Sequence, residues 1–450
     1  MGLGKLTALW GRVRDSLWFL PSVMTVAAIA LAIVTIQLDL AGVADVPEPD
    51  ESAEGPGPLR LLFSGTPDGA RQILSAIASG LITVTGVVFS VTIVALQLAS
   101  TQFTPRILRN FTADRGNQVV LGMFIATFTY ALLVLRVVRG DEGVGAFVPN
   151  LSLTVAMTLT LVSIGFLIFF INHAARSVQA SVIIDRVSSD ALRTISQTLP
   201  GDAPGLVRDD VERHVPRGQG TIVAARTTGY LQGVDEEALM DLLDAEAYTI
   251  RMEPAVGDFV MAGAALVTLW PAGPGADSDV ADEIRSAFIL GFERTPHMDA
   301  ELPVVELSDI AVKALSPGIN DPTTATHCLD RLAEIVVEFG RREPPPRVHI
   351  HPTSGGVLIL PRIAFEHFVG TALDQIRHFG AGNPHFAMTI LERLGEMGKL
   401  LPPNRHPPLA RQAQAVRRAA LSARPESSDA ADIERAAADA LVDLDAGSGP

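Results

Sequence analysis

The sequence predicts a membrane protein with four N-terminal transmembrane α-helices followed by a cytoplasmic α+β domain. Four apolar runs lie within residues 1–175, and each is long enough to cross a hydrocarbon core of roughly 30 Å. Hydrophobic residues make up 48% of the 450 residues and charged residues only 19%, which is typical of a chain partly immersed in lipid. After residue 175 the pattern changes to amphipathic helices and short strands, which indicates a second, water-exposed part.

The transmembrane domain is expected over residues 1–175, with spans at about 17–38, 73–100, 119–138 and 151–171. Lys5, Arg12 and Arg14 precede the first span. A signal peptide is the alternative interpretation of this run, because basic residues also precede the apolar core of a signal peptide. However, its apolar run of about 20 residues is longer than such a core, and no small-residue cleavage site follows it. We therefore interpret the first run as a membrane anchor.

Basic residues in the short loops predict the orientation, because cytoplasmic loops are enriched in lysine and arginine. The loop at residues 39–71 holds seven acidic residues and two arginines, so we expect it outside. The loop at residues 101–117 carries Arg106, Arg109 and Arg115 against Asp114, so we expect it inside. The prediction is a multi-pass protein of the cell (plasma or inner) membrane with both termini in the cytoplasm.

The second span carries a polar stripe. Its members follow one another at steps of four, three, four and seven residues, so they share one helix face: Ser79, Thr83, Gly86, Ser90 and Gln97. Small and hydroxylated residues let membrane helices pack closely. The same face could instead line a water-filled pathway with Gln102, Arg106 and Arg109 at its inner mouth. The sequence leaves both interpretations open.

Several classes of function are disfavoured by what the sequence lacks. The central part of each span contains no Asp, Glu, Lys or His, which disfavours a carrier driven through an intramembrane proton relay. The formal charge of −15 argues against nucleic acid as a partner. The single cysteine, Cys328, excludes a disulfide framework and a cysteine zinc site, and we expect it in a core.

The part after the spans is predicted to begin with a helical stalk and a small β-rich domain. The stalk at residues 176–200 has an apolar stripe that needs a partner, either another domain or another copy of the chain. The β-rich domain at residues 206–275 resembles a barrel-sandwich hybrid around Val256–Leu266. Biotinyl and lipoyl carriers have that fold, but their modified lysine is missing here, so no swinging-arm chemistry is expected.

A mainly helical domain is predicted at residues 278–405, followed by a tail rich in Ala and Asp at residues 406–450. Within the helical domain, residues 347–361 predict a β-hairpin. We expect the tail to end in a frayed helix, since chain ends fray unless they are tied down.

The helical pattern near residue 315 is interrupted by six residues typical of a helix end and a new helix start: Ser316, Pro317, Gly318, Asn320, Asp321 and Pro322. We expect Gly318 to take the backbone turn, Asp321 to cap the next helix and Pro322 to occupy its first position. We interpret this stretch as a structural corner. The alternative is an anion or partner site at the helix start, which the charge of Asp321 would oppose for an anion.

No constellation of residues indicates catalysis. His349 and His351 share one face of a predicted strand, but no third metal ligand lies at a suggestive spacing. Phosphate-cradling loops, nucleophile elbows and zinc-protease motifs are also missing from the sequence. We therefore expect no catalytic residues, no metal, no cofactor and no enzymatic activity.

Three stretches carry a family resemblance: "TGVVFSVTIVALQLASTQFTPRILRNF" at residues 85–111, "LGMFIATFTYALLVLR" at 121–136 and "DIAVKALSPGINDPTTA" at 309–325. Together they resemble the bacterial predicted membrane protein family called domain of unknown function 2254, over roughly residues 17–401. The resemblance implies an integral membrane protein with several N-terminal spans and a soluble C-terminal region. It implies no activity, substrate or catalytic residue.

We expect a homo-oligomer in the lipid bilayer that is channel-like or transport-related, acts on a small ion or solute, and is gated or assembled by its cytoplasmic part. The polar stripe of the second span and the stalk after the fourth are the observations behind this hypothesis. The alternative is a non-conducting, membrane-anchored sensor or scaffold, in which the stripe serves only helix packing.

Overall fold

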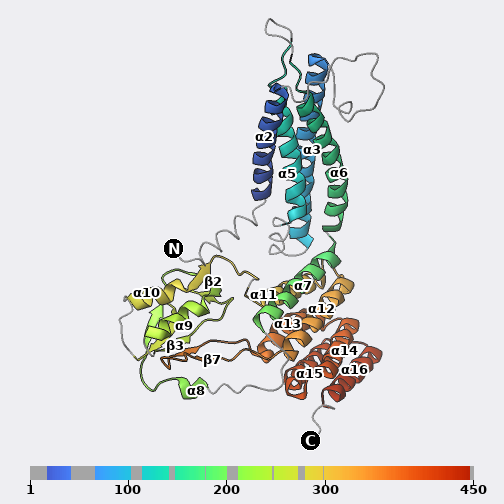
Figure 1. Ribbon diagram of the computed structural model, residues 1–450. Coiled ribbons are helices and arrows are strands. Elements are labelled where there is room, and N and C mark those ends of the chain that lie inside the picture. Colours follow the sequence, from blue (N-terminus) through green and yellow to red (C-terminus); the bar gives the residue numbers. More distant parts are fainter. Residues whose placement is uncertain are drawn as a thin grey trace. The chain divides into compact units, whose positions relative to one another are not determined.

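The structure is a computed structural model, and it forms two compact units, Met1–Gln179 and Ala180–Pro450. It describes residues 18–41, 66–102, 114–140, 147–177, 179–199, 211–245, 248–271, 279–296 and 298–445. Figure 1 shows the elements of both units.

The first unit contains four helices long and apolar enough to cross a membrane, which confirms the four predicted spans. They are α2 (Phe19–Leu40), α3 (Pro67–Gln102), α5 (Arg115–Leu135) and α6 (Asn150–Ser177). Both α3 and α6 are longer than the predicted spans, and α3 reaches 36 residues. Two of the helices start with a local signal: Pro67 begins α3, and the Asp114 side chain caps α5.

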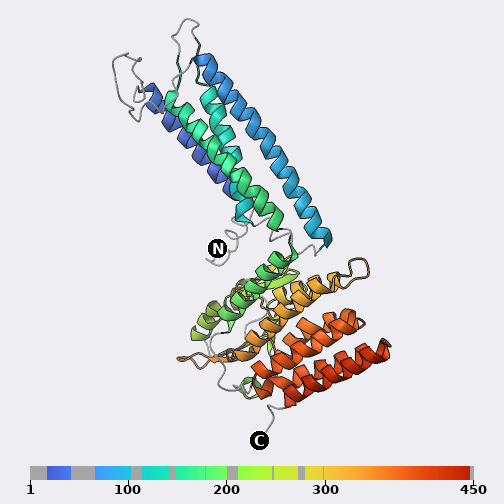
Figure 2. The same ribbon diagram turned by 90° about the vertical axis from the view of Figure 1, so that its right-hand side faces the viewer.

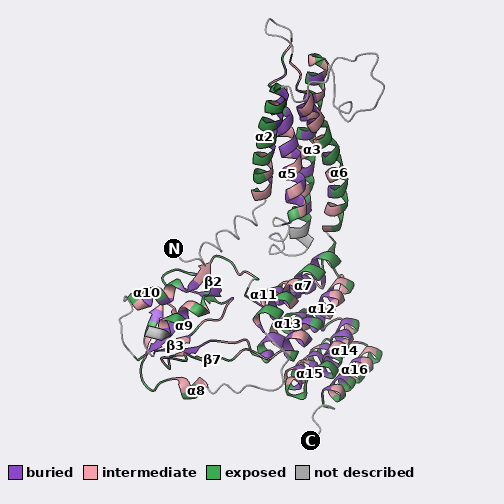
Figure 3. Cartoon of the chain, viewed as in Figure 1, coloured by how far each residue is buried: buried purple, intermediate pink, exposed green. Residues whose placement is uncertain are grey.

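Helix α5 is the centre of this unit, because α2, α3 and α6 all pack against it (Figure 1). Figure 3 shows that α5 is the helix with the most buried surface, whereas the outward faces of the other three are exposed. Its residues Tyr130 and Phe124 are among the largest fully buried side chains in the described part of the chain. Gly122 allows α2 to approach α5 closely, because a Cβ atom there would lie 2.6 Å from Met24 Sδ.

The second unit contains a stack of three helical hairpins: α11 (Leu302–Ala314) with α12 (Pro322–Arg341), α13 (Phe365–Gly380) with α14 (Pro384–Leu400), and α15 (His406–Ser422) with α16 (Ser427–Asp445). Helices α11, α13 and α15 pack on one another in one layer, and α12, α14 and α16 in the other (Figure 1). Figure 2 shows the hairpins stacked one on the next. Stacked hairpins bury their apolar faces against their neighbours, as in helical repeat proteins.

The residues predicted to form a stalk are a separate helix, α7 (Ala180–Thr198), at one end of this stack. Its apolar face includes Ile184, Val187 and Ile195, all of them buried, and packs against α11 and α12. The partner that this face needs is therefore another part of the same chain. Cys328, which lies on α12, is buried in the core as predicted.

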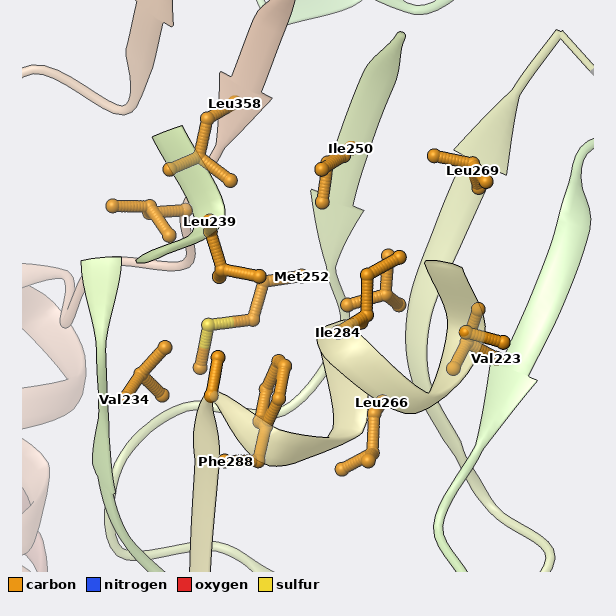
Figure 4. Close-up of a cluster of buried hydrophobic side chains, with 14 of the residues drawn as sticks. Val223, Val234, Leu239, Ile250, Met252, Leu266, Leu269, Ile284, Phe288 and Leu358 are labelled. Atoms are coloured by element: carbon orange, nitrogen blue, oxygen red, sulfur yellow. The ribbon is translucent and has the colours of Figure 1, made fainter. Parts of the chain in front are cut away.

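The β-rich part of the second unit contains two sheets. The larger sheet has the strand order β1 (Thr221–Ala224), β5 (Ala265–Trp270), β3 (Thr249–Met252), β8 (Val357–Ile359) and β7 (Val348–Ile350). The smaller sheet has the order β4 (Phe259–Val260), β2 (Gly229–Val234) and β6 (Phe288–Gly291). Helices α9 (Glu236–Ala245) and α10 (Asp279–Ser286) contribute Leu239 and Ile284 to the core that lies between these elements (Figure 4).

The predicted small domain at residues 206–275 leaves out part of this core. Strands β7 and β8 form the hairpin expected at residues 347–361, but β8 also pairs with β3 in parallel, so the hairpin completes the larger sheet. Leu358 on β8 is buried beside Ile250 on β3, and Phe288 of β6 lies in the same core (Figure 4). Such pairings join residues about 100 positions apart, and no local pattern predicts them.

The C-terminal tail is also more ordered than expected. Helix α16 buries Ile433, Ala437 and Ala440 against α14 and α15 instead of fraying. The buried His406 at the start of α15 contacts the end of α16: its Nδ1 lies at hydrogen-bond distance, 2.6 Å, from the carbonyl oxygen of Leu444. The Ala-rich composition that suggested a weak tail instead gives a flat helix face that packs closely.

Candidate functional site

The polar stripe of α3 lies on the outside of the four-helix unit. All five of its members, Ser79, Thr83, Gly86, Ser90 and Gln97, are exposed. The buried face of the same helix includes Leu74, Leu81 and Val88, which pack toward α5 and α6. At about 100° per residue, the stripe is on the side of α3 opposite to this buried face.

The hydroxyl groups of the stripe bond to their own helix. Ser79 Oγ donates to the carbonyl oxygen of Ser75 at 2.7 Å, Thr83 Oγ1 to that of Ser79 at 2.8 Å, and Ser90 Oγ to that of Gly86 at 2.9 Å. These bonds satisfy the hydroxyl hydrogens without a neighbouring helix. Each hydroxyl oxygen keeps acceptor capacity that water or another helix could use.

The glycine in the stripe leaves its surface open. A Cβ atom at Gly86 or at the nearby Gly80 would meet nothing within 4 Å. This face therefore has no packing partner within the described part of its own chain. The proposed inner mouth cannot be placed in the same way, since Arg106, Arg109 and the side chain of Gln102 lie outside the described residues.

A buried polar network joins three helices at one end of the unit. Asp39, near the end of α2, accepts hydrogen bonds from the backbone N–H groups of Leu151 and Ser152, both at 2.9 Å, and from Ser152 Oγ at 2.6 Å. The Tyr130 hydroxyl of α5 donates to the Ser152 carbonyl oxygen at 3.1 Å and lies 2.9 Å from Thr35 Oγ1. Asp39 thus caps the start of α6 from another helix.

A second carboxylate joins α5 and α6 at the opposite end. Asp114 Oδ1 accepts a hydrogen bond from the N–H of Gly116 at 2.8 Å and lies 3.0 Å from His173 Nε2. The His173 ring also stacks on Phe169. Between the two ends, Thr127 Oγ1 of α5 and Ser163 Oγ of α6 lie 3.2 Å apart in a buried position.

These contacts were missed by the sequence analysis, which placed Asp39 and Asp114 in loops and ended the fourth span before His173. A signal for both was present in the sequence. Each aspartate lies next to the start or end of an apolar run, where a carboxylate can cap the N-terminus of a membrane helix. What the sequence could not supply was which helix start each carboxylate faces.

An apolar groove runs between α3 and α6. It has a volume of about 620 Å³ and is lined by residues from Thr83 to Leu98 on α3 and from Leu167 to Ala175 on α6. Thr83 is the one lining residue with a side-chain hydroxyl, and that hydroxyl already donates to its own helix. The groove and the polar stripe therefore share an edge of α3.

The predicted corner lies in the second unit, between α11 and α12. The Asp321 side chain accepts hydrogen bonds from the N–H of Thr324 at 3.0 Å and from its hydroxyl at 2.6 Å, and Pro322 begins α12. These bonds to Thr324 lower the pKa of the Asp321 carboxyl. The backbone turn differs from expectation: Asn320 has the positive φ, at 50°, and Gly318 does not.

Asn320 can adopt the positive φ of this turn because asparagine tolerates the left-handed region better than most other residues. Ser316 contributes by accepting the N–H groups of Ile319 and Asn320 on its carbonyl oxygen. Pro317, Gly318 and Asn320 are all exposed. The stretch carries local hydrogen bonds that account for its residue types, so we keep the interpretation of a corner.

Three histidines of the second unit have separate partners. His349 Nε2 lies 3.4 Å from an Arg362 side-chain nitrogen, and His351 Nδ1 lies 3.1 Å from Ser354 Oγ. His367 pairs with Glu301 at 3.2 Å. Within the described stretches of the chain, no three His, Cys, Asp or Glu side chains come together in a way that could hold a metal ion.

A buried ion pair ties the β-rich part to the hairpin stack. Asp299, only 1% exposed, accepts two hydrogen bonds from the Arg294 guanidinium at 2.6 and 2.8 Å, and two more from the backbone at the start of α11. Gly257, with φ 97°, lies directly against this pair: a Cβ atom there would be 2.7 Å from an Asp299 oxygen. Burial raises the pKa of the neighbouring Glu301 carboxyl.

Comparison with known proteins yields relatives but no activity. The model of the family described as "Predicted membrane protein (DUF2254)" matches residues 14–396. Uncharacterized proteins of Mycobacterium bovis and Mycobacterium tuberculosis are each similar to this chain, with 34% identity over 388 residues that cover 84% of it and 73% of the relative. No solved structure matches the chain.

Proposed function

Because the chain belongs to the DUF2254 family of predicted membrane proteins, we propose that it is a channel-like homo-oligomer whose copies meet along the polar stripe of α3. The observation that carries this proposal is the direction of the stripe. Its five residues lie on the exposed side of α3, opposite to the face that packs within the unit. A polar face that contacts lipid tails makes no stabilising interaction with them, whereas one that contacts other copies can pack closely or enclose water.

The chemistry of the stripe suits a small, hydrated ion or solute. Its hydroxyl and amide groups are neutral, and their oxygens can accept hydrogen bonds or replace part of a hydration shell. Gly86 and Gly80 leave room for a close approach between copies, because nothing lies within 4 Å of a Cβ atom at either position. The second unit, with its stacked hairpins, supplies a surface for assembly or gating.

The proposal is tested first by cross-linking in the membrane. We expect cysteine at Ser90 to form disulfide-linked dimers under mild oxidation, since two copies would bring this position together. The matched control is cysteine at Thr158, an exposed hydroxyl residue of α6 whose Oγ1 donates to its own helix in the same way. Burial raises the pKa of the Cys328 thiol to about 12, so the introduced cysteine is the reactive one.

The same variants then separate a channel from a scaffold. We expect purified protein in liposomes to conduct monovalent ions, and Ser90→Leu to lower the flux while Thr158→Leu leaves it unchanged. Cross-linking at Ser90 without any flux would support the non-conducting sensor or scaffold. Equal cross-linking at Ser90 and Thr158 would contradict the proposed interface.

We also propose that the membrane is the cell (plasma or inner) membrane and that both termini lie in the cytoplasm. The basic residues Arg115 and Arg176 flank the ends of α5 and α6 on the side assigned to the cytoplasm. We expect a membrane-impermeant maleimide to label cysteine at Ala53 in intact cells, and cysteine at Ser189, which is exposed on α7, only after lysis. The reverse labelling would invert the topology.

A further inference from the structure

The polar face of α3 continues beyond the stripe, toward the start of the helix. Asp68 precedes Ser79 by eleven residues, which is about three helical turns at 3.6 residues per turn. Gln72 precedes Ser79 by seven residues, about two turns, so both residues lie on the face of the stripe. Both are exposed, as the members of the stripe are. The face therefore begins with a carboxylate, at the end of α3 that we assign to the outside.

The carboxylate of Asp68 supplies the formal charge of this face, because α3 has no charged residue from Gln72 to Leu98. Arg71 forms a pair with it at 3.7 Å, and pairs between exposed side chains compensate each other only weakly. The Arg71 guanidinium also donates to the carbonyl oxygen of Val138, just after α5, at 3.4 Å. Arg71 is thus turned toward α5, which packs on the side of α3 opposite to the stripe.

The hydroxyl groups farther along the face present acceptors. Those of Ser79, Thr83 and Ser90 each donate their hydrogen to a carbonyl oxygen of α3 itself. A hydroxyl has one hydrogen and two lone pairs, so it offers a second partner only acceptor capacity. Oxygen acceptors can replace the hydration shell of a cation, whereas an anion needs donors. An anion could be bound only if a hydroxyl gave up its bond to the helix.

A carboxylate in the first turn of a helix also has a role that requires no particular face. It interacts favourably with the positive end of the helix dipole wherever in that turn it lies. That role alone would affect the stability of α3 and would not affect which ions pass. The two roles therefore have different readouts.

From these observations we propose that the ions conducted along the stripe are monovalent cations, and that Asp68 determines this specificity at the outer end. The inference rests on the proposed function, because copies that meet along the stripe place their Asp68 carboxylates around one entrance. Rings of carboxylates are used for this purpose in cation channels. A cation that enters from outside passes the carboxylates first and the hydroxyl oxygens next.

The test measures reversal potentials of the full-length protein in planar bilayers, with a gradient of potassium chloride across the bilayer. We expect the parent protein to prefer K⁺ to Cl⁻. Asp68→Asn should lower this preference by at least about fivefold, the factor that corresponds to about 1 kcal/mol for one unit charge at about 4 Å in water. The difference should shrink in about 1 M salt, where the Debye length is only about 3 Å.

Two further variants serve as controls. Asp68→Glu keeps the carboxylate and should keep the preference for K⁺. Arg71→Gln removes the charge that is turned toward α5, and it should not lower the preference. Asp68→Asn itself should fold and assemble as the parent does, because its side chain is 85% exposed.

The outcomes separate this inference from the proposed function. A protein that cross-links at Ser90 and conducts no ions contradicts the channel, and the inference falls with it. A protein that prefers Cl⁻ to K⁺ leaves the channel in place and overturns the inference, since the arginines expected at the inner mouth would then select the ion. An unchanged preference in Asp68→Asn overturns the role of Asp68.

Discussion

Replacement of Asp299 by alanine is expected to destabilise the second unit by about 3–5 kcal/mol, the cost of removing one partner of a buried ion pair. The carboxylate is almost fully buried and holds the Arg294 guanidinium with two hydrogen bonds. It also caps α11 through the N–H groups of Glu301 and Leu302. Alanine would leave a positive charge and two N–H donors without their acceptor. Thermal or denaturant unfolding of the full-length protein in detergent measures the change.

The matched control is the neighbouring carboxylate, Glu301, exchanged for glutamine. Burial raises the pKa of the Glu301 carboxyl, so the folded state binds its proton more tightly than the unfolded chain does. Its charge therefore lowers stability at neutral pH, and its contribution becomes more favourable as the pH falls through the raised pKa. Glu301→Gln should change stability by less than about 0.5 kcal/mol or increase it. Equal losses for the two variants would show that the ion pair and the cap made by Asp299 contribute no more to stability than the neighbouring carboxylate does.

The second large effect is expected in the membrane unit, from Asp39→Ala. This change removes the acceptor for two N–H groups and one hydroxyl at the start of α6. Unsatisfied donors cost about 1–3 kcal/mol each when buried, so the total loss should be on the order of 3 kcal/mol or more. We expect a lower melting temperature in detergent and faster proteolysis.

Two further variants show whether the hydrogen bonds or the charge cause this effect. Asp39→Asn keeps one acceptor oxygen and should lose less stability than Asp39→Ala. Asp68→Ala removes an exposed carboxylate from the first turn of α3, where a surface pair with Arg71 contributes at most about 1 kcal/mol. An Asp39→Ala protein as stable as Asp68→Ala would mean that the cap of α6 is dispensable.

The four spans could be predicted from the sequence because each is a long apolar run, and length alone decides whether a helix can cross the bilayer. The cap at Asp321 follows from a local motif of a few residues, and the structure has it at the expected position. Both depend on neighbours in the sequence. Tertiary contacts are not needed to recognise them.

The direction of the polar stripe could not be predicted in the same way. Periodicity shows that Ser79, Thr83 and Ser90 share a face, but it does not show which face of α3 the other helices cover. That depends on the packing of α3 against α5, through residues whose apolar character is the same as that of the lipid-facing ones. In a membrane helix hydrophobicity does not distinguish the two faces.

Two features of the second unit were not predicted from the sequence for a similar reason. Strand β8 pairs with β3, which precedes it by about 100 residues, and only the assembled sheet shows that Leu358 and Ile250 share a core. The tail, rich in Ala and Asp, was expected to fray because it lies at the end of the chain. In α16 the alanines instead allow close packing on α14.

Helix α3 also differs from its neighbours in a way that concerns the bilayer itself. Its apolar part begins at Ile73, after Asp68 and Arg71, and rises by about 38 Å to Leu98, whereas the 21 residues of α5 span about 32 Å. A hydrophobic helix longer than the bilayer tilts or thickens the lipid around it. Hydrophobic mismatch therefore acts on α3 and hardly on α5, so a thinner membrane favours a more tilted α3. The thickness of the membrane thereby biases the angle of the one helix that carries the polar stripe.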